Sequence, residues 1–142
     1  MRLYWRPFRP RTLGVRAVVL DGRDRVVLVR HTYGDFWYLP GGGVKKGESF
    51  EAALRRELAE EIALEDVTVE RLVGIYHSRR EHKDDHIAIF AVRAEGETQR
   101  ADRNEVQEVG WFSLLDLPAD ISPATQRRLD EYRMGIVRSG QW

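Results

Sequence analysis

A run of glycines leading directly into a helical pattern is the feature of this sequence that most restricts its fold. Residues 40–48 have the sequence Pro-Gly-Gly-Gly-Val-Lys-Lys-Gly-Glu, which contains too much glycine for a regular element. Ser49 follows and is a suitable N-cap for a helix predicted over residues 50–62. Glycine lets the backbone approach a ligand closely, although such a loop by itself is also typical of an ordinary turn. The segment is therefore a first candidate for a binding site.

The predicted helix carries an apolar stripe and an acidic patch. The stripe has helical spacing and is the face that should pack against a sheet: Phe50, Leu54 and Leu58. The patch consists of three glutamates at positions i, i+3 and i+4: Glu57, Glu60 and Glu61. At about 100° per residue, Glu61 projects close to Leu54, at the rim of the stripe. A carboxylate at that position is poorly placed for full hydration.

The charge of this acidic patch allows two interpretations. Neighbouring positions on a helix are about 5–6 Å apart, and two like charges at that distance repel by roughly 3 kcal/mol at an effective dielectric constant of about 20. Sheltered carboxylates would therefore favour a bound cation, and oxygen ligands without nearby His or Cys favour Mg²⁺ or Mn²⁺ over zinc. The alternative is a solvated acidic face paired with Arg55 and Arg56, which is the commoner case for an isolated acidic run.

Strands are predicted on both sides of this helix. Apolar runs bounded by turn signals indicate strands at residues 15–20, 25–31, 36–39 and 106–112. A further pair of strands, at residues 67–77 and 87–94, is joined by a polar loop at residues 78–86. Ser122 and Pro123 begin a closing helix that extends to about residue 137. This order of elements predicts a mixed α/β fold, of the α+β type.

Length and composition exclude several classes of protein. The 142 residues suit one folded domain over residues 14–142, preceded by an extended arm at residues 1–13. The absence of cysteine excludes disulfides, a thiolate nucleophile and Cys-ligated metal sites. No apolar run is long enough to span a bilayer, and the N-terminus lacks a secretory signal, so we expect a cytoplasmic protein without membrane contact. Its 23 basic and 23 acidic residues give zero net charge, which disfavours a nucleic-acid partner.

The glycine segment and the helix together resemble a known family. The spacing of these residues resembles the Nudix box, G-x5-E-x7-R-E-U-x-E-E-x-G-U. Five residues separate Gly42 from Glu48, and seven more separate Glu48 from the sequence Arg-Glu-Leu-Ala-Glu-Glu-Ile-Ala-Leu at residues 56–64. The segments 37–42 and 111–118 are also similar to Nudix hydrolases, so the resemblance extends from about residue 14 to residue 118. Ala63 stands where the pattern has its last glycine, and alanine is disfavoured there if a positive φ must end the helix.

The resemblance implies a fold and a reaction. Nudix hydrolases have a mixed β-sheet between helices and cleave a nucleoside diphosphate linked to another group X, using water and a divalent metal. We therefore expect a Mg²⁺-dependent hydrolase, with Mn²⁺ as an alternative metal, that acts on a nucleoside triphosphate or an NDP-sugar. A nucleotide-binding sensor without hydrolysis and an RNA 5′-end pyrophosphohydrolase that uses the basic arm are the alternatives. Many relatives are dimers, so a homodimer is also possible.

Residue roles follow from the same resemblance. The metal-binding carboxylates would be Glu57, Glu60 and Glu61, assisted by a backbone carbonyl in the region of Gly42 and Gly43. Either Glu57 or Glu61 would activate water as the base. Arg56, paired with Glu48, would orient the acidic cluster, an outer arrangement that fixes the geometry of metal ligands.

Further candidate residues lie outside the motif. A carboxylate often joins the metal from a loop after the strands, and Glu105 is preferred over Glu108 because Glu108 lies near a predicted strand. Arg79, in the polar loop, is a candidate for attracting a phosphate-rich substrate, although such charges more often only solubilise a loop. Tyr33 and Phe36 precede the glycine segment and are candidates for stacking on a nucleobase.

Overall fold

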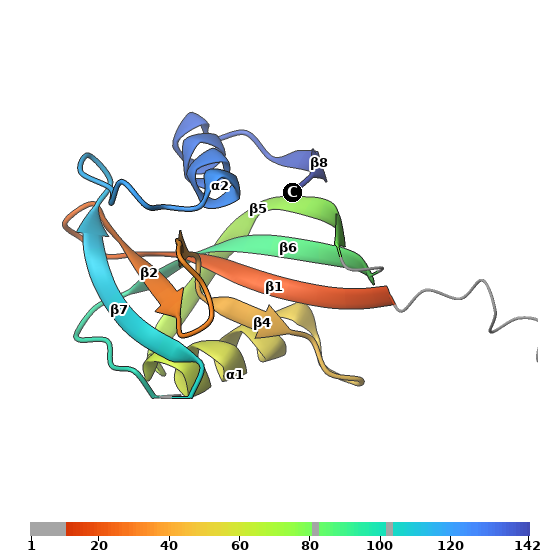
Figure 1. Cartoon of the computed structure of the whole chain (residues 1–142), viewed down its shortest axis with the longest axis horizontal. Helices are drawn as coiled ribbons and strands as arrows, with labels where there is room; N and C mark the ends of the chain where they lie inside the picture. The colour runs from red at the N-terminus through yellow and green to blue at the C-terminus, as the bar shows by residue number, and fades with distance from the viewer. Residues whose placement is uncertain (1–10, 81–82, 102–103) are drawn as a thin grey trace, which may run out of the picture.

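The computed structural model describes residues 11–80, 83–101 and 104–142. Its strands join in one mixed sheet, with helices on two opposite sides of the molecule (Figure 1). The elements in chain order are β1 (Arg11–Leu20), β2 (Arg25–His31), β3 (Trp37–Tyr38), β4 (Gly41–Gly43), α1 (Phe50–Ile62), β5 (Val67–Arg80), β6 (Lys83–Ala94), β7 (Val106–Ser113), α2 (Pro123–Met134) and β8 (Arg138–Gln141). The predicted mixed fold class is confirmed.

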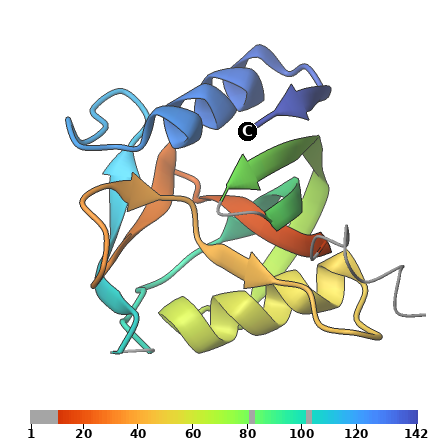
Figure 2. The same ribbon diagram turned by 45° about the vertical axis from the view of Figure 1, so that its right-hand side comes forward.

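β1 is the strand that connects the parts of the sheet. The strand order is β3-β2-β1-β6-β5-β8, with β4 also paired to β1 and β7 also paired to β2. β1 runs parallel to β6, from the pair Arg11 and Asp84 to the pair Leu20 and Arg93. The other edge of β6 forms a long antiparallel hairpin with β5. Figure 2 shows β4 running beside α1. The glycine segment is therefore held between a central strand and the acidic helix.

Alternating residues of β1 divide between two apolar cores. The core on the α1 side contains three β1 residues and the inner face of the helix: Val15, Ala17, Val19, Ala53, Leu54, Leu58 and Ile62. The core on the α2 side contains the other β1 residues and a leucine of α2: Val18, Leu20 and Leu129. Phe50, predicted as part of the buried stripe, is 36% exposed, because it lies in the first turn of α1 at the end of this core. Leu54 and Leu58 are buried as predicted.

Several observed boundaries of strands and helices agree with those predicted from the sequence. β2 and α1 span the predicted residues, and β7 exceeds its prediction by one residue. α2 begins at Pro123 after the Ser122 cap but ends at Met134, three residues before the predicted end, because Gly135 adopts a φ of 73° and terminates it. None of the helices in the described part of the chain is long and apolar enough to cross a membrane.

Other boundaries differ because strand pairing extends them. The polar residues predicted as a loop at 78–86 are part of the β5–β6 hairpin as far as the described residues show, since Ser78 pairs with Asp85 and Arg79 with Asp84. Residues 11–13, assigned to the arm, belong to β1 through pairing with β6, whereas residues 1–10 lie outside the described part. β8 was not predicted; it pairs with β5 although all four of its residues are exposed.

Candidate active site

Gly41–Gly43 form a strand, which corrects the prediction of an irregular segment at residues 40–48 for these three positions, while residues 44–48 belong to no helix or strand. Gly41, Gly42 and Gly43 pair antiparallel with residues 14–16 of β1. A Cβ atom on Gly42 would lie 2.5 Å from Cδ of Glu57, so that only glycine leaves room for this carboxylate against the strand. Gly41 has a φ of 150°, which also favours glycine. The glycines therefore allow the backbone of β4 and the acidic face of α1 to lie in contact.

The start of α1 is fixed by its cap. Ser49 has an extended backbone, and its hydroxyl oxygen accepts a hydrogen bond from the backbone N–H of Ala52 at 3.0 Å. The other end of α1 is less favourable, because Ala63 adopts the left-handed conformation with a φ of 61°. The positive φ considered for this position is therefore present, and alanine occupies it. Its N–H still bonds to the carbonyl oxygen of Ala59 at 3.2 Å.

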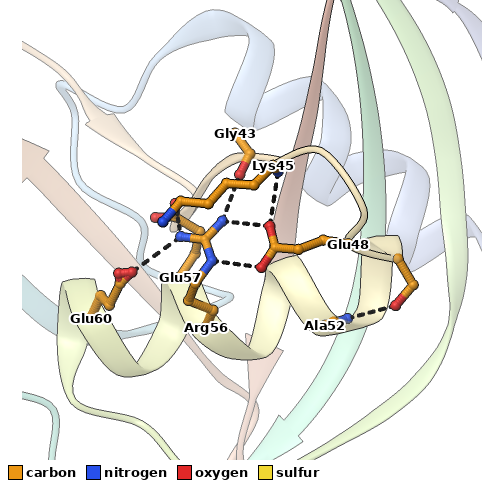
Figure 3. A network of polar contacts seen from close by, with 8 residues as sticks. Gly43, Lys45, Glu48, Ala52, Arg56, Glu57 and Glu60 are labelled. Carbon is orange, nitrogen blue, oxygen red and sulfur yellow. Dashed lines mark hydrogen bonds and ion pairs between the residues drawn. The ribbon is translucent and has the colours of Figure 1, made fainter.

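Arg56 connects four groups of the motif (Figure 3). It donates two hydrogen bonds to Glu48, from Nε to Oε2 at 2.7 Å and from Nη2 to Oε1 at 2.9 Å. Nη2 also donates to the Gly43 carbonyl at 2.9 Å. Nη1 donates to Glu57 at 2.9 Å and to Glu60 at 3.1 Å. One planar guanidinium thus sets the relative positions of β4, Glu48 and two glutamates of the acidic patch.

Opposite pKa shifts accompany the pair of Arg56 and Glu48. The hydrogen bonds from Arg56, followed by one from the backbone N–H of Lys45 at 2.8 Å, lower the pKa of Glu48 to about 2. Glu48 in turn raises the pKa of Arg56. Both groups therefore remain charged over the whole physiological range.

The pKa of Glu57 is shifted upward, in contrast to that of Glu48. Its side chain is about one-fifth exposed, and burial raises its pKa. The hydrogen bond and charge of Arg56 counteract this shift, whereas the charges of Glu61 and Glu60 add to it. Arg56 therefore does not fully compensate the negative charge at this position. A cation would stabilise the ionised form of Glu57.

Glu61 is buried at the rim of the α1 core, as its helical position predicts. It is 7% exposed. Its Oε1 accepts a hydrogen bond from the Gly41 N–H at 3.1 Å, and its Oε2 lies 3.4 Å from Nε2 of His31. His31 ends β2, and nothing in the sequence links it to a residue thirty positions away. Its contact with the acidic patch follows only from the folded arrangement of β2, β4 and α1.

The three glutamates offer the right atoms for a hard divalent cation. All are carboxylates on one helix; Glu61 and Glu57 lie against the backbone of β4, at Gly41 and Gly42, and Glu60 is linked to them through Arg56. Among the residues that the structure describes, no three acidic or histidine side chains converge as a metal-binding group, because Arg56 lies between Glu57 and Glu60. The donor chemistry and the only partly compensated charge at Glu57 fit a cation.

Glu105 and Glu108 have different surroundings. Glu108 forms an ion pair with Arg30 of β2. Glu105 precedes β7, and its carbonyl oxygen accepts a hydrogen bond from the Thr32 N–H at 2.9 Å, just beyond His31. Burial, then the charge of Glu105, and also that of Glu61, raise the pKa of Tyr33. The fold thus brings Glu105 to the side of the acidic patch where His31 and Tyr33 lie.

A cavity of about 390 Å³ lies between the start of α2, the end of β5 and the end of β8. Tyr38 of β3 lines it, and the ring of Tyr38 is 5.8 Å from that of His31, which contacts Glu61. Arg79 also lines the cavity and is 62% exposed. Tyr33 does not line it; this residue is 77% exposed and stacks on His31 with a centroid distance of 5.2 Å.

Sequence reasoning missed two groups beside the site. Arg16 of β1 pairs with Gly41, and its Nη1 donates to the Leu39 carbonyl at 2.8 Å. Within residues 11–80, 83–101 and 104–142, Arg16 makes no ion pair with a carboxylate. The cavity residue Trp142 was also missed. The alternation of β1 could have indicated that Arg16 is inward-facing, whereas no local signal placed Trp142.

Comparisons with known proteins agree with this geometry. A family model described as NUDIX domain matches residues 10–132. A putative 8-oxo-dGTP diphosphatase of Bacillus subtilis is 28% identical over 124 residues, which cover 87% of this chain and 81% of that protein. An RNA pyrophosphohydrolase of Teredinibacter turnerae is 46% identical over 66 residues, but these cover only 46% of this chain and 37% of that protein.

A solved structure is similar over nearly its whole length. The crystal structure of a MutT NUDIX hydrolase from Burkholderia pseudomallei superimposes with a TM-score of 0.72 at 26% sequence identity. The match covers 85% of this chain and 97% of that one. The two chains therefore share the same overall fold.

Proposed function

Because this chain belongs to the NUDIX domain family and is a hydrolase of pyrophosphate bonds, we propose that it uses Mg²⁺ to cleave a nucleoside diphosphate linked to a further group X. The substrate would be a nucleoside triphosphate or an NDP-sugar. The observation that carries this proposal is the partly buried Glu57, held against Gly42 beside Glu60 and Glu61 with its charge only partly compensated.

The acidic patch would hold the metal. Glu57, Glu60 and Glu61 supply carboxylate oxygens, and the backbone carbonyl of Gly42 supplies a neutral one. When bound, Mg²⁺ would neutralise diphosphate oxygens and lower the pKa of a coordinated water. Glu105, at the His31 side of the patch, is the candidate for a further oxygen ligand.

Arg56 and Glu48 would act as positioning residues. The two hydrogen bonds between them fix the guanidinium plane, and the remaining donors of Arg56 contact Glu57, Glu60 and the Gly43 carbonyl. This contact set orients the carboxylates before a metal arrives, which is the role of outer partners in metal sites.

Glu57 fits the role of the base better than Glu61. Both oxygens of Glu61 already contact polar groups, at Gly41 and His31, and its side chain is almost fully buried. The side chain of Glu57 is about one-fifth exposed, so a water molecule can approach its carboxylate more easily than that of Glu61. In the proposed reaction Glu57 accepts a proton from the attacking water, and the water oxygen forms a bond to phosphorus as the P–O bond to the leaving phosphate breaks.

The cavity would receive the part of the substrate that does not react. Tyr38 lines the cavity and its ring is 5.8 Å from that of His31, so the cavity would be close enough to the acidic patch for one substrate to reach both. Arg79 and Arg127 line the cavity and bring positive charge to it. The exposed ring of Tyr33, stacked on His31, is a candidate contact for the nucleotide at the same edge.

An RNA 5′ end is the second candidate substrate. The RNA pyrophosphohydrolase of Teredinibacter turnerae shows the higher identity of the two relatives, although over a segment of only 66 residues. The zero net charge argues against RNA. The arginine-rich residues 1–10, which would contact it, lie outside the described part of the chain.

The test is a hydrolysis assay with Mg²⁺ over dNTPs, 8-oxo-dGTP, UDP-glucose, ADP-ribose and 5′-triphosphorylated RNA, measuring released phosphate or mononucleotide. Glu57→Gln and Glu61→Gln should each reduce turnover by at least about 100-fold with the fold intact. Glu51→Gln is the matched control, because Glu51 is exposed on the same helix and pairs with Arg55 rather than with Arg56. Turnover like that of the wild type in both site variants would refute the proposal. Nucleotide binding without any turnover would favour the sensor alternative.

A further inference from the structure

We propose that Trp142 forms the wall that limits the size of the group accepted by the cavity, and so determines substrate specificity. This inference rests on the proposed function, because it takes the cavity as the site of the unreacting part of the substrate. It concerns a residue outside the motif and outside the residues matched by the family model.

Backbone contacts fix the position of Trp142. Its N–H donates to the carbonyl oxygen of His77 at 3.0 Å, which continues the pairing of β8 with β5. Its backbone oxygen accepts a hydrogen bond from Nη2 of Arg127 at 2.6 Å. His77 and Arg127 both line the cavity together with Trp142. His77 and Arg127 therefore both line the cavity and hold the backbone of Trp142 in place.

A buried arginine packs against the indole ring of Trp142. Arg128 of α2 is 2% exposed, and its Cζ lies 3.8 Å from the ring centroid of Tyr76 and 5.2 Å from that of Trp142. The two rings are 6.0 Å apart at an angle of 66°. Cation–π contacts of this kind are strongest where water is excluded, as it is here.

Polar contacts hold Arg128 and Tyr76 in turn. Glu131, 8% exposed, pairs with Arg128 Nε at 2.9 Å and accepts a hydrogen bond from the Tyr76 hydroxyl. Burial, and then this hydrogen bond, raise the pKa of Tyr76 to about 12, so the hydroxyl keeps its proton. Gly74 allows the close approach of β8, because a Cβ there would lie 2.7 Å from the Arg138 carbonyl oxygen and 2.5 Å from the Tyr76 hydroxyl.

Trp142 packs against the α2-side core and also lines the cavity. None of the residues of β8 itself is buried, so the strand gains little from apolar packing. The anchoring contacts concentrate on Trp142 and leave part of its surface lining the cavity, which Phe36 and Tyr38 also line from the β3 side. A flat group in the cavity would meet aromatic surfaces from β3 and from Trp142, and a larger ring system would meet a wall that cannot easily retract.

The experiment compares the full-length wild type with Trp142→Ala and Trp142→Phe, using dCTP and dGTP as substrates with one-ring and two-ring bases. The ratio of kcat/KM for dGTP to that for dCTP should rise about tenfold in Trp142→Ala, with a smaller rise in Trp142→Phe. Trp111→Ala is the matched control, since Trp111 packs on the α1 core and does not line the cavity. It should lose thermal stability but change the ratio by less than about twofold.

A binding measurement separates this inference from the proposed reaction. Titration of ¹⁵N-labelled wild type with dGMP and dCMP should shift the indole N–H signal of Trp142, assigned by its loss in Trp142→Phe, while the Trp111 signal stays in place. If the wild type hydrolyses nucleotides but the Trp142 signal and the substrate ratio do not change, the inference is wrong and the proposed function stands. If no nucleotide is hydrolysed, the proposed function fails, and a shift of the Trp142 signal still supports the wall. Absence of any shift overturns the inference in either case.

Discussion

Glu48 and Arg56 form a two-point ion pair with N–O distances of 2.7 and 2.9 Å, connecting the segment before α1 to the middle of that helix. Paired hydrogen bonds of this type fix the orientation of the guanidinium as well as its position. Because the same guanidinium contacts Glu57 and Glu60, the pair governs the geometry of the acidic patch without belonging to the three proposed metal ligands.

The pair should make stability dependent on acid pH. The pKa of Glu48 is about 2 in the folded protein against an ordinary value of 4.5, so the folded state binds fewer protons between these values. Its contribution is complete above pH 4.5 and is lost as the pH falls toward 2. Urea unfolding at several pH values should show a smaller acid-induced loss in Glu48→Gln than in the wild type. Parallel pH profiles of the two proteins would contradict this.

Arg56→Lys should weaken metal binding while leaving the fold intact. A lysine ammonium keeps the charge but cannot contact Glu48, Glu57, Glu60 and Gly43 with one planar group. We expect a loss of about 10–100-fold in Mn²⁺ affinity, measured by calorimetry. Arg55→Lys is the control, because Arg55 is exposed and contacts Glu51 and the Val67 carbonyl instead. An equal loss in both variants would show that the contacts of Arg56 are not the cause.

Gly42→Ala should displace Glu57. The added Cβ would lie 2.5 Å from the carboxyl carbon, so the side chain must leave its position. Displacement of a catalytic group by about 1 Å can lower kcat/KM about 100-fold. Gly43→Ala adds the same methyl group with nothing within 4 Å of it, and its effect should be at least about tenfold smaller. Circular dichroism checks that both variants are folded, and equal kinetics would contradict the prediction.

Ala63→Gly should stabilise the protein. Ala63 has a φ of 61°, a conformation that costs a residue with a Cβ about 1 kcal/mol relative to glycine. A gain of about 1 kcal/mol should raise Tm by about 2–4 °C. Ala52→Gly, on the exposed face of α1, should have the opposite effect of about 0.5–1 kcal/mol, since its backbone is helical. Thermal unfolding of both variants tests this, and a fall in Tm for Ala63→Gly would contradict it.

Elements specified by neighbouring residues were predictable. The Ser49 cap and the apolar spacing gave the bounds of α1, and the turn at residues 21–24 gave β2 its start. The helical period also placed Glu61 beside the apolar stripe, where it is indeed buried. These features depend on interactions within a few residues, so the order of residue types contains the information.

Elements that depend on a distant partner were not predictable. The glycine segment became β4 because β1 offers it hydrogen bonds, and the polar residues around Arg79 became strand because β5 and β6 pair along their length. Polarity and glycine content describe local preference, which pairing with another strand overrides.

The sequence by itself determined the helix, its cap, its three glutamates and the membership of the chain in a hydrolase family. Only the tertiary structure decided that His31 contacts Glu61, that Arg56 donates to the Gly43 carbonyl, and that Trp142 lines a cavity. The physical reason is the separation along the chain between interacting residues, because caps and helical spacing act over three or four residues. The contacts of His31 with Glu61 and of Trp142 with His77 instead join residues 30 or more positions apart through sheet pairing and core packing.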